Sequence, residues 1–131
     1  MRKIKRIIGG LLLVVLSLVP GFAYTQEIVV IVNSSNGKDN LSKAELREIF
    51  MGKTAFWDSN LKIVPINQTE EKIVSKFINT IIGLPPEVYK NYWVKKLFQE
   101  GVMPPGQKGT SQEVISAISG NTGGIGYLLK S

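Results

Sequence analysis

Three short polar segments carry side chains that could hold a small anion. They adjoin the apolar, strand-like runs at 28–32, 61–66 and 125–129. Amides and hydroxyls donate hydrogen bonds to oxyanions, and ligands of open α/β sheets bind beyond the carboxyl ends of strands. The alternative interpretation is that the segments are ordinary turns and helix caps, which use the same residue types. The candidate ligand-binding residues are Asn33, Ser34, Ser35, Asn67, Gln68, Thr69, Asn121, Thr122 and Gly123.

The sequence offers little for catalysis. It has no histidine, the most common general base and metal ligand, and no cysteine, which excludes a disulfide framework. Glu70 and Glu71 could act as paired carboxylates, but adjacent helical positions point in different directions. Acidic residues at a helix start are better explained by the helix dipole. We therefore expect a binding protein, not an enzyme, with no cofactor and no metal site.

The aromatic residues suggest a second kind of site. Phe56 and Trp57 lie in a loop, so they are candidates for contact with a protein partner, with packing onto the domain as the alternative. Tyr89, Tyr92 and Trp93 have helical spacing, which favours a place in the core.

The elements that must position these residues can be read from caps and periodicity. Ser42 and Glu45 form a capping box, and Gly52 fits the left-handed residue after a helix. We expect helices at 42–51, 70–82, 86–100 and 111–119, the second capped by Thr69, between the three apolar strands. This order predicts an α/β fold: a small, mostly parallel or mixed sheet of about three strands, covered by about four helices.

The first 23 residues have the features of a secretory signal peptide. Arg2, Lys3, Lys5 and Arg6 precede an apolar run at 7–19, and Ala23 suits a cleavage site. The run is shorter than the roughly 20 residues that span a bilayer. We expect a single domain at 24–131 that is periplasmic or secreted. The alternative is an uncleaved N-terminus that anchors the protein in the membrane.

The charge of the chain follows from this segment. The whole sequence has a formal charge of +6, but four of its sixteen Lys and Arg residues belong to the predicted leader. Without the leader, twelve basic residues stand against ten acidic ones. A nucleic-acid surface needs a clustered basic stripe, and residues 24–131 show none beyond Lys90, Lys95 and Lys96, which fit the solvated face of one helix. We therefore expect no nucleic-acid partner.

Several motifs resemble a known family. The chain is similar to the small, phosphate-transporter-type substrate-binding proteins of the type 2 periplasmic-binding superfamily, which serve ABC transporters. The similarity covers nearly all of residues 24–131, and the pairing of IF-x-GK-x-x-x-W with a terminal G-x-IGY carries most of it. The matching segments are 28–36, 41–57, 63–67, 92–105 and 113–128.

The resemblance implies one periplasmic-binding-protein-like lobe of an exported protein. In the family an oxyanion such as phosphate lies in a cleft between two lobes, and this chain resembles mainly one. The family's second anion loop falls at 67–71, where only Thr69 matches in type. Two functions follow. The chain is a solute-binding protein for phosphate or a related oxyanion, its cleft completed by self-association, or it is a reduced, non-transport lobe that acts as an interaction or sensory module for a periplasmic or inner-membrane protein.

Overall fold

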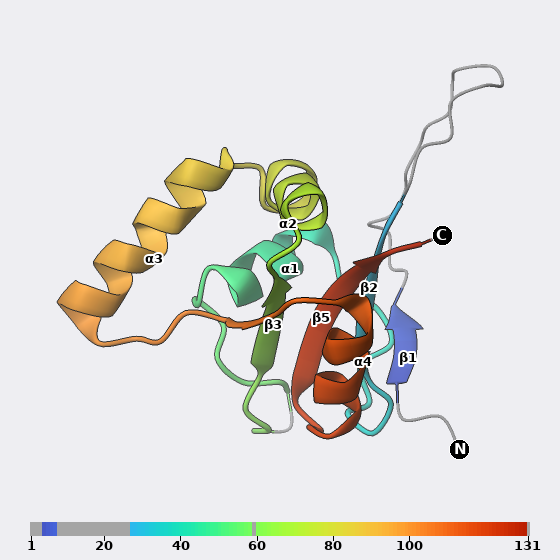
Figure 1. Ribbon diagram of the computed structural model, residues 1–131. Helices are drawn as coiled ribbons and strands as arrows, with labels where there is room; N and C mark the ends of the chain where they lie inside the picture. Colours follow the sequence, from blue (N-terminus) through green and yellow to red (C-terminus); the bar gives the residue numbers. More distant parts are fainter. Residues whose placement is uncertain (1–3, 8–26, 59, 131) are drawn as a thin grey trace, which may run out of the picture.

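A five-stranded mixed sheet forms the centre of the described part of the protein (Figure 1). The computed structural model describes residues 4–7, 27–58 and 60–130. The strand order is β1-β2-β5-β3-β4, with β2 antiparallel to β1 and β5, and β3 parallel to β5 and β4. The strands are β1 (Ile4–Ile7), β2 (Ile28–Asn33), β3 (Val64–Gln68), β4 (Gly106–Lys108) and β5 (Gly124–Leu129).

The mixed α/β fold is confirmed, with two strands more than the sequence predicted. β1 lies inside the predicted signal peptide, of which residues 1–3 and 8–23 lie outside the described residues. β4 has three exposed residues, so no apolar pattern marks it. The strand predicted at 61–66 begins at Val64 and continues through Gln68, because two polar residues taken for a turn extend the ladder.

Four helical segments cover the sheet, as predicted. They are α1 (Lys43–Phe50), α2 (Glu71–Phe77) with its π-helical continuation η1 (Ile78–Ile82), α3 (Pro86–Glu100) and α4 (Ser111–Ser119). The capping box at the start of α1 is present: Glu45 N donates to Ser42 Oγ at 3.0 Å, and Ser42 N to Glu45 Oε1 at 3.1 Å. The predicted cap at Thr69 is wrong, because Glu70 is the capping position and its side chain makes no cap bond.

Two features of the structure require a glycine at position 52, just after α1. Its φ of +75° belongs to the left-handed region, and a Cβ there would lie 2.6 Å from the Trp93 ring. This close approach lets α3 lie against the end of α1. Trp93 Nε1 and Tyr89 OH both donate to Phe50 O, at 3.1 and 2.9 Å, and fix that contact.

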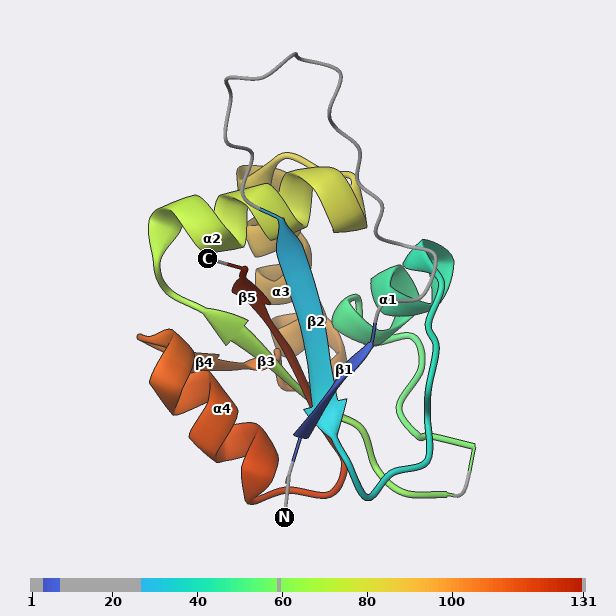
Figure 2. The ribbon, with the colours of Figure 1, turned by 90° about the vertical axis from the view of Figure 1, so that its right-hand side faces the viewer.

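The sheet has a larger core on one face and a smaller one on the other. Helices α1, α2 and α3 lie on the first face and α4 on the second (Figures 1 and 2). In the larger core the rings of Phe77 and Tyr127 stack at 3.7 Å, with Phe50 against both. The smaller core comprises Ile31, Ile66, Val114 and Ile118. Figure 1 shows α3 farther from the sheet than α1 and α2.

Candidate functional site

The three polar segments do not meet at one edge of the sheet. Because β2 runs antiparallel to β5, the end of β2 lies beside the start of β5. β3 is parallel to β5, so its end lies at the opposite edge. The structure thus brings 33–35 and 121–123 together at one end of the strands, which we call the β2–β5 edge. Segment 67–69 lies with 108–111 at the other, which we call the β3–β4 edge.

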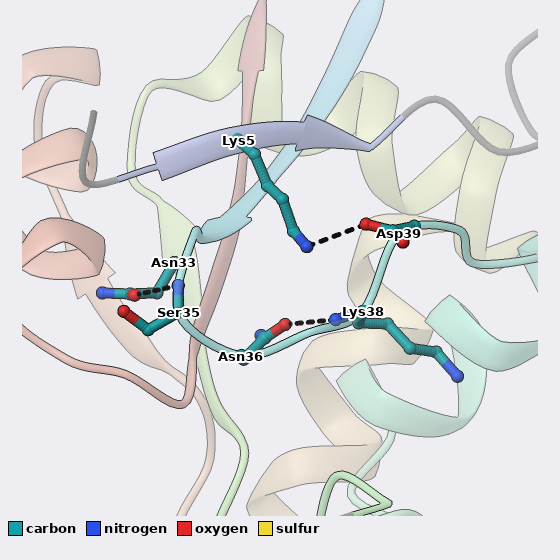
Figure 3. Close-up of polar contacts among 6 residues, drawn as sticks. All are labelled: Lys5, Asn33, Ser35, Asn36, Lys38 and Asp39. Carbon is teal, nitrogen blue, oxygen red and sulfur yellow. Dashed lines mark hydrogen bonds and ion pairs between the residues drawn. The ribbon is translucent and has the colours of Figure 1, made fainter. Parts of the chain in front are cut away.

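At the β2–β5 edge, the asparagines mainly hold the backbone. Asn33 is buried; its Nδ2 donates to Ile118 O at 2.8 Å and Ser119 O at 3.3 Å, and its Oδ1 accepts from Ser35 N at 2.8 Å (Figure 3). Asn121 Oδ1 accepts from Gly123 N at 3.1 Å. These bonds tie the turn after β2 to the end of α4.

This edge is electrostatically unsuited to an anion. α4 ends here at Ser119, and the carboxyl end of a helix carries partial negative charge. Ser35 and Thr122 are exposed, Ser34 is half-buried and Gly123 is buried. The hydroxyls are therefore reachable, but the fixed dipole beside them favours a cation.

At the β3–β4 edge, two of the three predicted donors point into the core. Asn67 Oδ1 accepts from Tyr127 OH at 2.6 Å, and Asn67 Nδ2 donates to Tyr89 OH at 3.1 Å. Gln68 Nε2 donates to Tyr127 O at 2.8 Å. Asn67 is 5% exposed and Gln68 1%. These amides connect β3 with β5 and α3, and neither side chain reaches solvent.

The two tyrosines in this network remain protonated donors at neutral pH. Burial raises the pKa of Tyr127 and of Tyr89 above the usual value of 10.0. In each case the bonds to neighbouring groups lower the pKa by less than burial raises it. Gln68 Oε1 is buried and has no partner within the described residues, so a group reaching it must offer a donor.

Thr69 is the predicted residue that does face solvent at this edge. Its backbone N donates to Lys108 O at 3.0 Å, which places the loop before α2 against the loop before α4. Its Oγ1 lies beside Gly109, 3.7 Å from where a Cβ of that residue would stand. The carboxyl ends of two parallel strands and the amino end of α4 therefore meet at Thr69.

Sequence reasoning missed the second half of this site, Lys108 to Ser111. Thr110 caps α4, since its Oγ1 accepts from Glu113 N at 3.1 Å. In a capping box the Glu113 carboxylate would accept from the backbone N of Thr110. Here Glu113 Oε1 accepts from the preceding residue, Gly109 N, at 2.9 Å. A shallow groove of about 650 Å³ lies over this loop and α4. It is lined by Gln107, Lys108, Gly109, Gln112, Glu113, Ser116 and Ala117.

The aromatic candidates divide between core and surface. Trp57 is buried, and its Nε1 donates to Gly123 O at 3.1 Å, so it joins the 53–60 loop to the β2–β5 edge. Phe56 is 55% exposed and remains available to a partner. Tyr89 and Trp93 lie in the core as expected, and Tyr92 is half-buried.

The outer side of α3 is apolar, which the sequence pattern did not indicate. Val94 is 47% exposed, Phe98 81% and Met103, just beyond the helix, 74%. The spacing of Val94 and Phe98 puts them on one side of α3, away from the buried Tyr89 and Trp93. We call these three residues the α3 patch. Single exposed apolar residues are ordinary, but Val94 and Phe98 lie one helical turn apart on the same side of α3, which makes that side a candidate interaction surface.

Two features are absent from the described part of the chain. No group of three or more acidic, histidine or cysteine residues there is arranged to hold a metal ion. None of the helices described is both long enough and apolar enough to cross a bilayer.

Comparison with known proteins gives the fold a precedent. No protein-family model and no curated protein matches the chain. Among solved structures, it is similar to an ABC-type phosphate transport receptor from Vibrio cholerae, with a TM-score of 0.52 and 16% identity. The match covers 79% of this chain and 41% of the receptor. The fold resembles a periplasmic-binding-protein lobe. At this identity the likeness shows the fold alone, and the chain spans about two fifths of the receptor's length.

Proposed function

We propose that the protein is a non-enzymatic, exported solute-binding lobe that takes phosphate or a related oxyanion at the β3–β4 edge. One observation carries the proposal: the loops before α2 and α4 meet beyond the carboxyl ends of parallel strands, where Thr69 N bonds Lys108 O. Ligands of open α/β sheets bind at this position. The similarity to a phosphate transport receptor supports this class of ligand.

The chemistry of the edge is compatible with an oxyanion. The amino end of α4 carries partial positive charge, and the first N–H groups of a helix lack intrahelical partners. Thr69 and Thr110 add hydroxyls, and Lys108 adds an exposed cation. The opposite edge has the carboxyl end of α4 instead, so the helix favours an anion at the β3–β4 edge only.

Glu113 sets the main obstacle to binding. Its carboxylate already accepts from Gly109 N at 2.9 Å, in the position where an oxyanion would compete for that donor. Glu70 and Glu71 at the start of α2 add negative charge nearby in the sequence. We therefore expect a weak intrinsic affinity that rises when the carboxylate is neutralised.

A single lobe supplies one wall of a cleft. The receptor that it resembles is more than twice as long as the matched part, which supports a second surface from another chain or another copy. Binding by one lobe exposes half of the ligand to water, where hydrogen bonds contribute less than in a closed site.

Isothermal titration of the full chain with phosphate and with sulfate tests this proposal. We expect saturable binding that Thr69→Val weakens about ten-fold, which is the lower end of the roughly 1.5–3 kcal/mol that a hydrogen bond to a charged group contributes. Glu113→Gln should strengthen binding, since the amide oxygen keeps the bond to Gly109 N without the charge. Thr122→Val at the β2–β5 edge is the matched control and should change nothing. Absence of saturable heat for wild type and Glu113→Gln together would refute the proposal.

The second candidate function is an interaction or sensory module of the periplasm, and the α3 patch favours it. Such a protein would use Val94, Phe98 and Met103, or Phe56, to bind a partner protein or another copy. Sedimentation velocity across a hundred-fold concentration range gives the first test. Self-association that Phe98→Ser abolishes, with no response to phosphate, would favour this function over solute binding.

A further inference from the structure

The outer strand β1 occupies an edge that the rest of the fold does not need it to fill. Its four residues pair antiparallel with β2, from Ile4 opposite Asn33 to Ile7 opposite Val30. Ile4 packs on the smaller core, and Lys5 Nζ lies 3.0 Å from Asp39 Oδ1 in the loop after β2 (Figure 3). Figure 1 shows β1 as a short strand at the outer side of β2.

Within the described residues, the core is otherwise built from 28–58 and 60–129. Every residue named in the larger core lies in those ranges, and Ile4 is the one contribution that β1 makes to the smaller one. Residues 4–7 also belong to the segment expected to be cleaved as a signal peptide. Loss of β1 would leave the core filled and expose the outer backbone N–H and C=O groups of β2.

We propose that the outer edge of β2 is a strand-acceptor site for an extended basic–apolar segment of another polypeptide, open once residues 4–7 have been removed. This rests on the prediction that the N-terminal segment is cleaved. β1 shows the chemistry that the edge takes. Backbone pairing supplies affinity, Asp39 faces a basic residue opposite Val32, and the smaller core takes an apolar residue opposite Asn33.

The tether explains why processing would control the site. While residues 4–7 remain joined to β2 through 8–27, they compete as an intramolecular strand. An attached segment competes at an effective local concentration that a free partner must exceed. Cleavage removes this advantage, so a free segment of the same pattern can bind.

The test uses the full chain with a protease recognition sequence inserted between residues 8 and 26. The chain is cut, the released N-terminus is removed by size exclusion, and a fluorescent peptide of residues 2–8 is titrated by anisotropy. We expect saturable binding to the cut protein and none to the uncut protein. Hydrogen-bonded residues alternate along an edge strand, so only one of two peptides, Lys5→Pro or Arg6→Pro, loses a ladder bond. We expect that peptide to bind much less than the other.

The ion pair gives a second readout. Exchanging Lys5 for Glu in the peptide, or Asp39 for Asn in the protein, should each weaken binding about two- to five-fold, as exposed ion pairs do. The two changes together should weaken binding by less than the product of their separate factors, because both remove the same ion pair. If the cut protein self-associates, peptide 2–8 should dissociate it. Failure of the peptide to bind, equal binding of both proline peptides, or self-association that the peptide leaves intact would each overturn the proposal.

Discussion

Replacing Tyr127 by Phe tests whether the candidate residues Asn67 and Gln68 serve the core or a ligand. Tyr127 OH donates to Asn67 Oδ1 at 2.6 Å, and both residues are buried. The substitution keeps the ring that stacks on Phe77 at 3.7 Å and removes only the hydroxyl. Asn67 Oδ1 then loses its donor in a place that water does not reach.

The expected loss follows from that geometry. A buried polar atom left without a partner costs about 1–3 kcal/mol, so the free energy of unfolding should fall by that amount. For a domain of this size each 1 kcal/mol lowers Tm by roughly 4–8 °C. Urea unfolding should show a lower midpoint with an unchanged m-value, which indicates a change in stability without a change in the surface exposed.

Tyr92→Phe is the matched control. Its hydroxyl donates to Met51 O at 2.6 Å, but Tyr92 is half-buried, so water can replace the lost donor. We expect a loss below about 1 kcal/mol. If Tyr127→Phe is no more destabilising than Tyr92→Phe, the polar network is not a structural tie, and Asn67 and Gln68 return as candidate ligand donors.

Two further predictions concern the same molecule. Because burial raises the pKa of Tyr127, unfolded chains release its proton from about pH 10 while native chains keep it; stability should therefore fall above pH 10, and less steeply in Tyr127→Phe, as measured by urea melts across pH. Gly123→Ala should destabilise strongly because its Cβ would overlap the Lys62 carbonyl oxygen, whereas Gly106→Ala, with open space around it, should be close to neutral; equal thermal midpoints for the two variants would contradict the packing described for the β2–β5 edge.

The sequence predicted local features well because their signals are local. The capping box of Ser42 and Glu45 and the left-handed Gly52 each need only neighbours within a few residues. The mixed sheet under four helices followed from the order of apolar runs. Single-sequence patterns could not show β4, whose three exposed residues pair with β3 through the backbone alone.

The candidate site was harder to predict because its bonds are distant in sequence. Asn67 and Gln68 resemble turn residues, and only the positions of two tyrosines, 22 and 60 residues further along the chain, turn them inward. The direction of β2 decides which loops share an edge, and no periodicity shows whether neighbouring strands are parallel. Thr69 was found by residue type. That Gly109 lies beside Thr69 could not be predicted from the sequence, because the two residues meet only through the pairing of β3 with β4.

The most direct test of the proposed function is a two-dimensional NMR titration of the ¹⁵N-labelled full chain with phosphate. The account predicts saturable shifts of the backbone amides of Thr69, Gly109 and Ser111 at the β3–β4 edge. The amides of Ser35 and Thr122, at the opposite edge, should stay in place. Shifts confined to the β2–β5 edge, or no shifts at phosphate concentrations that saturate weak sites, would contradict the central claim.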